Sequence, residues 1–212
     1  YCLEQSRTPE AFEADLLAAK NAALKFGCDL KSLVFPRNQF NPYYLKVCYD
    51  NGIRVVRSNP SSWFWRPITD KGANVARKFY RTGDAYLPLA KNRTSYPLQS
   101  VIQVVGEPIQ LPASRLLRPW KPGFSPLNKL ALHRVVQEMK AAAAHNECYH
   151  LWWHPENFGH YPQENIANLR ILLQQYEDCK KRFNMKSWNM GEYETYFDNE
   201  KKNNKVIAMT SL

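Results

Sequence analysis

The 212-residue sequence lacks several features that would place it in a recognisable class. No apolar run approaches the roughly 20 residues that a membrane-spanning helix needs, so we predict no membrane span. There is no C-x-x-C motif, and the five cysteines are odd in number and widely spaced, which argues against a disulfide framework or a zinc ribbon. We therefore expect buried, reduced cysteines and a cytoplasmic location. No internal repeat and no low-complexity segment is present.

A long basic tract is also missing, although 29 Lys and Arg against 19 Asp and Glu give a net charge of +10. The basic residues are scattered in small groups along the chain, and no nucleic-acid-binding motif accompanies them. This distribution favours a solvated surface and no nucleic-acid partner. A basic nucleic-acid-binding module remains a third interpretation, behind the two developed below.

The first residue is not methionine, and no charged-then-apolar leader opens the chain. An apolar content of 44% and an aromatic content of 13% nevertheless support a real core. We expect residues 1–212 to be a single domain that is truncated at its N-terminus, with an oligomeric state that the sequence does not indicate.

Helical and strand-like segments alternate, which is typical of α/β proteins with parallel strands covered by helices. Thr8 and Pro9 mark the start of the first helix and Gly27 its end. We predict four strands, parallel or nearly so in one curved sheet, at about 32–36, 53–57, 100–105 and 148–153. The predicted helices cover 9–26, 41–52, 72–81, 126–146, 162–184 and, more weakly, 190–202.

Two histidines four residues apart lie in "CYHLWWHPENFG" (148–159), which suits a metal site, a strand with one reactive imidazole, or ordinary core. The aromatic content and Pro155 favour extended backbone. At about 3.3 Å per residue, the histidines then lie roughly 13 Å apart, too far to chelate one zinc. His150, Trp152 and His154 share one face, and His154 falls at the carboxyl end of the strand, where α/β proteins collect their chemistry. A structural and a catalytic role for His154 both stay open at this point.

Several pieces together resemble the polysaccharide deacetylases, the NodB-homology carbohydrate esterases, and most of all their surface-glycan biosynthesis branch. They are "LVFPRNQFNPYYLKVCYDNGIRVVRSN" (33–59) and "HLWWHPENFG" (150–159), followed by a long helix and "WNMGEYE" (188–194). The resemblance implies a deformed (β/α) barrel that hydrolyses N-acetyl groups on a polysaccharide or oligosaccharide. It also implies a divalent metal, often zinc, that activates water.

The resemblance also implies roles for particular residues. The family's strand-end histidine, which protonates the leaving amine, matches His154. The family's arginine, which orients the catalytic Asp, maps onto Arg37, although the order here is Phe35-Pro36-Arg37-Asn38 rather than F-R-x-P. The family's Asp-Asp and H-x-x-x-H segments are absent, so we expect the metal ligands upstream of this chain and none within it.

Two residues are expected to contact the sugar: Trp65 in an aromatic loop and Asn157 in the polar segment after His154. The family's Asp-and-Trp loop is represented only by "SNPSSWFW" (58–65), without the aspartate. The alternative function is therefore a non-catalytic carbohydrate-binding or scaffolding domain with a decayed deacetylase barrel.

Overall fold

The structure is a computed structural model that describes residues 8–36, 40–60, 63–66, 75–87 and 94–199. It divides into two compact units, each formed by segments that are distant in sequence. Unit 1 contains residues 1–58, 101–111 and 187–212, and unit 2 contains residues 59–100 and 112–186. Both units mix helices with small sheets, so the coarse α/β prediction is confirmed. Whether the chain is one deacetylase-like domain stays a prediction.

Unit 1 begins with α1 (Pro9–Leu24), whose start follows the sequence signals. The Thr8 hydroxyl accepts a hydrogen bond from the Ala11 N–H at 3.3 Å, and Pro9 occupies the first turn. The chain leaves the helix through Gly27, whose φ of 72° favours glycine. Phe12 of α1 stacks on Tyr44, with ring centroids 4.4 Å apart. These contacts attach α1 to the core.

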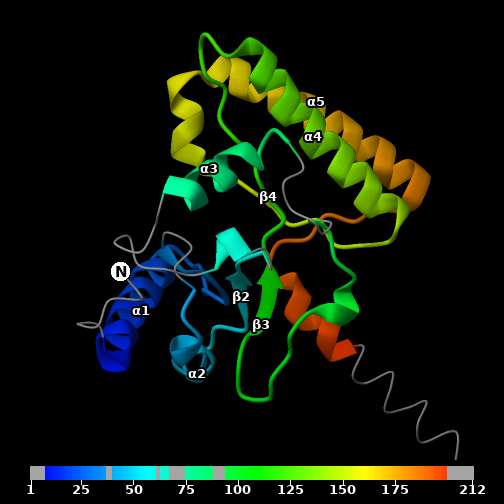
Figure 1. Ribbon diagram of the computed structural model, residues 1–212. Helices are drawn as coiled ribbons and strands as arrows, with labels where there is room; N and C mark the ends of the chain where they lie inside the picture. The colour runs from blue at the N-terminus through cyan, green and yellow to red at the C-terminus, as the bar shows by residue number, and fades with distance from the viewer. Residues whose placement is uncertain (1–7, 37–39, 61–62, 67–74, 88–93, 200–212) are drawn as a thin grey trace, which may run out of the picture. The chain divides into compact units, whose positions relative to one another are not determined.

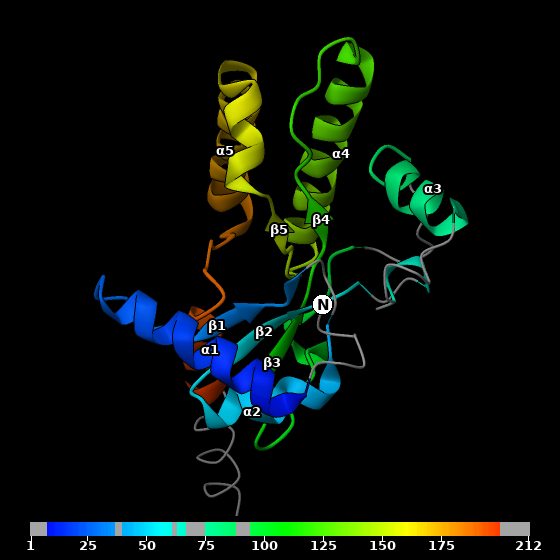
Figure 2. The same cartoon turned by 90° about the vertical axis from the view of Figure 1, so that its left-hand side faces the viewer.

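The core of unit 1 lies between helices and a three-stranded sheet of order β1-β2-β3. The strands are β1 (Ser32–Val34), β2 (Val55–Ser58) and β3 (Ile109–Pro112), and β1 and β2 are parallel with Leu33 opposite Val56. Figure 2 shows α1 running across one face of this sheet. The fully or nearly fully buried residues of this core are Leu16, Phe35, Tyr44, Leu45, Cys48, Ile53 and Val56.

Between β1 and β2, the predicted helix at 41–52 is a short 3-10 turn, η2 (Pro42–Tyr44), followed by α2 (Leu45–Asp50). The Asn51-Gly52 pair ends α2, and Gly52 has a φ of 82°. Residues 192–199 form a further helix of unit 1, in the segment where a weak helix was predicted. In this helix, the Glu194 Oε1 atom lies 3.5 Å from the Nε atom of Arg54. This ion pair links the helix to the segment that precedes β2.

Unit 2 consists of two long helices beside a two-stranded sheet. The helices α4 (Ser125–Ala144) and α5 (Pro162–Phe183) lie alongside each other (Figure 1), close to their predicted limits. The strands β4 (Arg115–Leu116) and β5 (Leu151–Trp152) are parallel. The buried residues that form the core of unit 2 are Leu117, Val135, Val136, Met139, Ala143, Leu172 and Cys179.

Shorter elements complete unit 2. The first two are the 3-10 helix η3 (Trp63–Trp65) and the helix α3 (Val75–Gly83), which overlaps the predicted segment 72–81. The 3-10 helix η5 (Leu98–Ser100) lies close to an isolated antiparallel bridge between Tyr96 and Cys148. After β5, η6 (Pro155–His160) leads into α5.

The strand predicted at 100–105 is wrong. Ile102 forms only an isolated bridge with Gln110, and a turn at Gly106 sends the chain back. The strand in this region is β3, where the Ile109 N–H donates to the Arg54 carbonyl at 2.8 Å. Pro108 and Pro112 made this segment a poor strand candidate, yet a proline is tolerated where its missing N–H is not needed for pairing.

The prediction of one curved sheet is also wrong for the strands that the structure describes. They form two sheets, β1-β2-β3 in unit 1 and β4-β5 in unit 2. The two parallel pairs, β1 with β2 and β4 with β5, agree with the predicted strand direction. Periodicity identified most elements, but it carried no information about which strands pair.

Candidate functional site

The carboxyl ends of β4 and β5 lie at the same edge of their sheet because the two strands are parallel. Leu116 is opposite Trp152, and the Leu117 N–H extends the pairing by donating to the Trp152 carbonyl at 2.8 Å. The chain that follows β5 carries His154, and the chain that follows β4 carries Trp120. The fold thus brings two segments over 30 residues apart to one edge, which is where α/β proteins commonly place their sites.

His154 is the candidate catalytic group at this edge. Its backbone is extended, with φ −103° and ψ 114°, and its side chain is 52% exposed. Nδ1 lies 3.5 Å from a carboxylate oxygen of Glu156. The imidazole also packs edge-on against Trp152, with ring centroids 5.3 Å apart. An exposed imidazole with a carboxylate on one side and an indole on the other can hold or release a proton towards a bound molecule.

The contact between Trp152 and His154 agrees with the prediction that these two residues share a face. His150 takes part in the pairing of the strands through its backbone: its N–H donates to the Ser114 hydroxyl at 3.0 Å and its carbonyl accepts from the Ser114 N–H at 2.9 Å. The extended conformation also agrees with the argument against chelation of one metal by His150 and His154. No cluster of three or more potential metal ligands occurs in the described ranges.

The segment after β4 is held against the start of α5. The Asn165 side-chain oxygen accepts a hydrogen bond from the Trp120 backbone N–H at 2.7 Å, and Asn165 is almost completely buried. The Trp120 ring packs edge-on against Tyr161, with centroids 5.0 Å apart. Within the described part of the chain, the Asn165 Nδ2 group has no hydrogen-bond partner. The Asn165 amide oxygen thus fixes the Trp120 backbone, and the buried Nδ2 group remains as a donor for a bound water or ligand oxygen.

A buried ion cluster lies beside the strands. Arg115 of β4 donates two hydrogen bonds to the Glu138 carboxylate, at 2.6 and 2.9 Å, and a third to the Asp84 carboxylate at 2.9 Å. Arg134 contacts the same two acids, at 3.0 Å for Glu138 and 3.4 Å for Asp84. The Tyr149 hydroxyl donates to Glu138 at 3.0 Å. Among the described residues, two cations therefore face two anions in this cluster.

The cluster controls the protonation of its members. Burial raises the pKa of Glu138, but the hydrogen bond and charge of Arg115, followed by the charge of Arg134, outweigh it and hold the net pKa below the ordinary value. Burial, and then the charge of Glu138, raises the pKa of Tyr149 well above its ordinary value. No local pattern in the sequence marks Arg115, Glu138 and Asp84 as a group. Only the i,i+4 spacing of Arg134 and Glu138 was visible as a possible pair.

The three other residues that were expected in the site are Arg37, Trp65 and Asn157, and the structure describes the last two. Arg37 lies outside the described residues. Trp65 is half-buried in η3, and the guanidinium of Arg81 lies over its ring, 5.2 Å from the centroid. The Asn157 N–H donates to the His154 carbonyl at 3.1 Å, which helps to form the turn after the histidine. The structure therefore places Asn157 beside His154, and it places Trp65 against an arginine.

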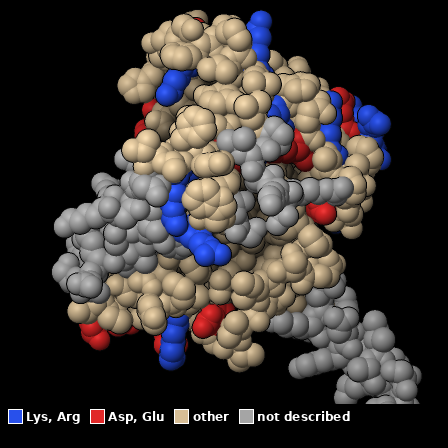
Figure 3. Space-filling view, in the orientation of Figure 1, with Lys and Arg blue, Asp and Glu red and all other residues tan. Residues whose placement is uncertain are grey.

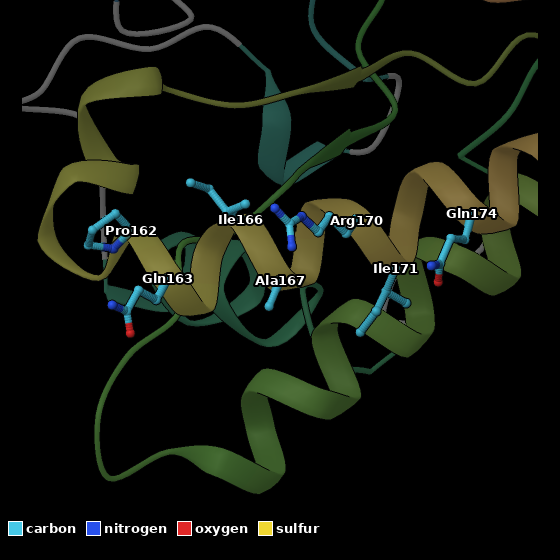
Figure 4. A pocket seen from close by; sticks show the side chains of 7 residues that line it. All are labelled: Pro162, Gln163, Ile166, Ala167, Arg170, Ile171 and Gln174. Atoms are coloured by element: carbon cyan, nitrogen blue, oxygen red, sulfur yellow. The ribbon is translucent and has the colours of Figure 1, made fainter.

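An open groove runs along α5, where Figure 4 shows its lining residues. The side chains come from this helix alone and are Pro162, Gln163, Ile166, Ala167, Arg170, Ile171 and Gln174. No His, Asp, Glu, Cys or Ser lines it, so it offers no group for acid-base or nucleophilic chemistry. The strand edge with His154 is the better candidate site.

None of the described helices combines the length and the hydropathy of a membrane-spanning segment. Compared with models of known protein families, with curated proteins and with solved structures, the chain has no significant match.

Proposed function

We propose that this chain is part of a metal-dependent deacetylase that hydrolyses N-acetyl groups on a polysaccharide or oligosaccharide of the cell surface. The sequence resemblance to polysaccharide deacetylases motivates the proposal. The single observation that supports it best is the position of His154: extended, half-exposed, and at the carboxyl end of a parallel strand pair. The deformed barrel of that family is part of the proposal.

In this proposal His154 protonates the amine that leaves when the N-acetyl bond breaks. Expulsion of an amine anion is unfavourable, and a positioned imidazole supplies the proton near neutral pH. Glu156 and Trp152 limit the orientations of the ring through the contacts described above. Asn157 and Trp65 contact the sugar, and Arg37 orients the catalytic carboxylate.

The resemblance implies a divalent metal, often zinc, but the described residues do not form a binding site for such a metal. They offer no group of three His, Cys, Asp or Glu side chains that could hold it. In the proposal, as the resemblance implies, the metal ligands belong to residues upstream of these 212, and no step through a metal is derived for this chain. What the chain itself supplies is the proton donor and part of the sugar-binding surface.

A second candidate function is carbohydrate binding or scaffolding without catalysis. The absence of a metal-ligand group in the described residues and of an aspartate in "SNPSSWFW" (58–65) favours it. Both candidates predict binding to N-acetylated sugars, and only the first predicts turnover.

Acetate release separates the two candidates. The complete protein that contains this chain is incubated with an N-acetylglucosamine tetrasaccharide and zinc, and free acetate is measured for the wild type and for His154→Ala. Turnover that depends on zinc and on His154 supports the deacetylase. Binding of the tetrasaccharide without acetate release, with or without zinc, supports the non-catalytic alternative.

A further inference from the structure

The side-chain amide of Asn165, near the start of α5, is buried and only half of its hydrogen-bonding capacity is used. Asn165 is 1% exposed, and its backbone N–H donates to the Tyr161 carbonyl at 3.0 Å. Its side-chain oxygen accepts a hydrogen bond from the Trp120 N–H at 2.7 Å, whereas Nδ2 has no partner in the described part of the chain. Buried polar groups are nearly always hydrogen-bonded, so this donor points to an acceptor that binds beside it.

The Trp120 N–H determines which way the Asn165 amide is turned. If the amide were rotated by 180°, Nδ2 would face this N–H and two donors would oppose each other. The observed orientation keeps the 2.7 Å bond and leaves Nδ2 without an acceptor among the described residues. The unpaired donor is therefore a consequence of the fold around Trp120, because exchanging the two ends of the amide does not satisfy it.

Two aromatic rings lie next to this amide. Trp120 is half-buried, Tyr161 is 36% exposed, and their rings meet edge-on with centroids 5.0 Å apart. Each of the two residues is also hydrogen-bonded to Asn165, Trp120 through its N–H and Tyr161 through its carbonyl. The three residues therefore meet in one place, where the chain that leaves β4 contacts the start of α5.

An amide donor beside aromatic rings has the chemistry of a sugar-binding subsite. The apolar faces of aromatic rings suit the C–H faces of a sugar, and a few placed polar groups fix its orientation. A hydrogen bond made in buried surroundings is stronger than one made in water. A site with a buried donor therefore discriminates strongly against ligands that leave that donor unpaired.

The charges around the start of α5 favour an uncharged acceptor over an anion. A helix N-terminus attracts anions, but Glu164 already places a carboxylate in the first turn of α5. The Asn165 donor is itself uncharged. On the face drawn in Figure 3, Lys and Arg side chains form separate small groups among uncharged residues, and no continuous basic surface is seen. A carbonyl or hydroxyl oxygen therefore suits this donor better than a phosphate or a carboxylate.

We propose that Asn165 is a specificity-determining residue for glycan binding, at the same sheet edge as His154. Its Nδ2 group donates to an uncharged oxygen of the bound glycan, and Trp120 and Tyr161 contact the sugar ring. The inference rests on the proposed function for its assignment to a sugar. The acetamido carbonyl is the acceptor that we expect, because it is the polar group that distinguishes an N-acetylated sugar from an unmodified one.

Binding at this amide requires a small local movement. Nδ2 is buried, so a ligand oxygen reaches it only after a neighbouring side chain has turned aside. The Tyr161 side chain is 36% exposed, and exposed side chains change rotamer rapidly without unpacking a core.

Calorimetric titration tests the inference without requiring turnover. The complete protein that contains this chain is treated with a chelator, so that no probe is hydrolysed. The probes are a tetrasaccharide of N-acetylglucosamine and a tetrasaccharide of glucose with the same linkage, which has a hydroxyl in place of each acetamido group. We expect the wild type to bind the N-acetylated probe about tenfold or more tightly than the glucose probe.

The variant Asn165→Asp keeps an oxygen for the Trp120 N–H and replaces the donor with a second acceptor. It should weaken binding of the N-acetylated probe about tenfold or more and change binding of the glucose probe by less than about twofold. An equal loss for both probes would identify a sugar hydroxyl as the acceptor. The matched control is Asn168→Asp, which makes the same chemical change at a half-buried position of the same helix and should keep the wild-type affinities.

A second measurement covers the case in which Asn165→Asp melts early. In the wild type, the nuclear magnetic resonance signals of the Asn165 side-chain amide protons should shift when the N-acetylated probe is added, and those of Asn168 should not. The variant Trp120→Leu retains the N–H that donates to Asn165 and removes only the indole. It should weaken binding of both probes about threefold or more.

Unchanged affinity of Asn165→Asp for both probes would overturn the inference, and so would Asn165 amide signals that stay in place at saturating probe. An equal loss in Asn168→Asp would also overturn it, because the effect would then come from the added charge. Tighter binding of inorganic phosphate than of either sugar would show an anion site instead. Failure of the proposed function looks different: the complete protein with zinc would release no acetate, whatever the binding data show.

Discussion

The imidazole of His154 lies edge-on to the indole of Trp152, with ring centroids 5.3 Å apart and ring planes at 87°. Alternation along an extended chain places the two residues on one face, and the indole then restricts the imidazole. The histidine itself remains 52% exposed, so this contact orients the ring without burying it. That combination suits a proton donor at a binding surface better than it suits a core residue.

Replacement of His154 tests this assignment. In the complete protein we expect His154→Ala to lower deacetylase turnover by roughly 10²–10⁴, the usual contribution of a positioned general acid. The melting temperature should barely change, because the side chain is half-exposed and its contact with Glu156 is exposed to solvent, where such contacts contribute little. His160→Ala, at the exposed end of η6, is the control and should keep full turnover. A large loss of stability with normal turnover per folded molecule would reject the catalytic role.

The ion pair between Arg115 and Glu138 predicts a large effect on the stability of unit 2. Arg115→Leu deprives two carboxylates in a buried site, Asp84 and Glu138, of the Arg115 guanidinium, and we expect a loss of about 3–5 kcal/mol in the free energy of unfolding. Hydrogen exchange of the α4 amides reports the opening of this unit alone. The exposed Arg170→Leu should change the same free energy by less than about 0.5 kcal/mol. A loss below about 1 kcal/mol for Arg115→Leu would show that the cluster is solvated.

The lowered pKa of Glu138 predicts how the stability of unit 2 depends on pH. The pKa of Glu138 is lower in the folded protein than in the unfolded chain, so its ionised carboxylate contributes fully to the free energy of unfolding at pH values above the unfolded pKa. This contribution is lost as the pH falls through the folded pKa. The pH range of the loss therefore lies below the ordinary pKa of 4.5. Glu138→Gln should therefore be less stable at pH 7 but lose less stability between pH 5 and 3 than the wild type. Exposed Glu177→Gln should follow the wild-type curve, and identical curves for all three would contradict the assigned shift.

Cysteine reactivity should report the two cores separately. Cys48 is buried in the core of unit 1 and Cys179 in that of unit 2, whereas Cys28 is exposed. Burial also raises the pKa of the Cys179 thiol, which lowers its thiolate fraction. We expect a thiol reagent followed by mass spectrometry to label Cys28 at once, and Cys48 and Cys179 only as each unit opens in denaturant. Rapid labelling of either buried thiol in native buffer would show that its core is loosely packed.

Metal binding by the isolated chain is expected to be weak. The described residues offer no three-ligand group, and the five histidines of the chain include no plausible triad by sequence spacing. After incubation with zinc and dialysis, elemental analysis should find well below one equivalent of zinc, and the chain should release no acetate. Tight, stoichiometric zinc would place a metal site within these 212 residues and contradict the assignment of the ligands to another segment.

The sequence by itself determined the local elements. The cap at Thr8, the stop at Gly27 and the periodicity of 126–146 and 162–184 predicted α1, α4 and α5 close to their observed limits, and Asn51-Gly52 predicted the end of α2. It also determined the extended backbone at His154. These features depend on residues within about one helical turn or one strand of each other, where capping, steric preference and alternation act directly.

The tertiary structure alone decided which elements meet. Asp84 and Glu138 reach Arg115 from 31 and 23 residues away in sequence, and no local pattern marks them as partners. The division into two sheets and the choice of 109–112 over 100–105 as a strand likewise depend on which backbone groups find a partner. A buried charge is tolerated only opposite its counter-charge, and a strand persists only beside another strand. The counter-charge and the neighbouring strand both come from distant parts of the chain. They can therefore be identified in the folded protein but not from local patterns in a single sequence.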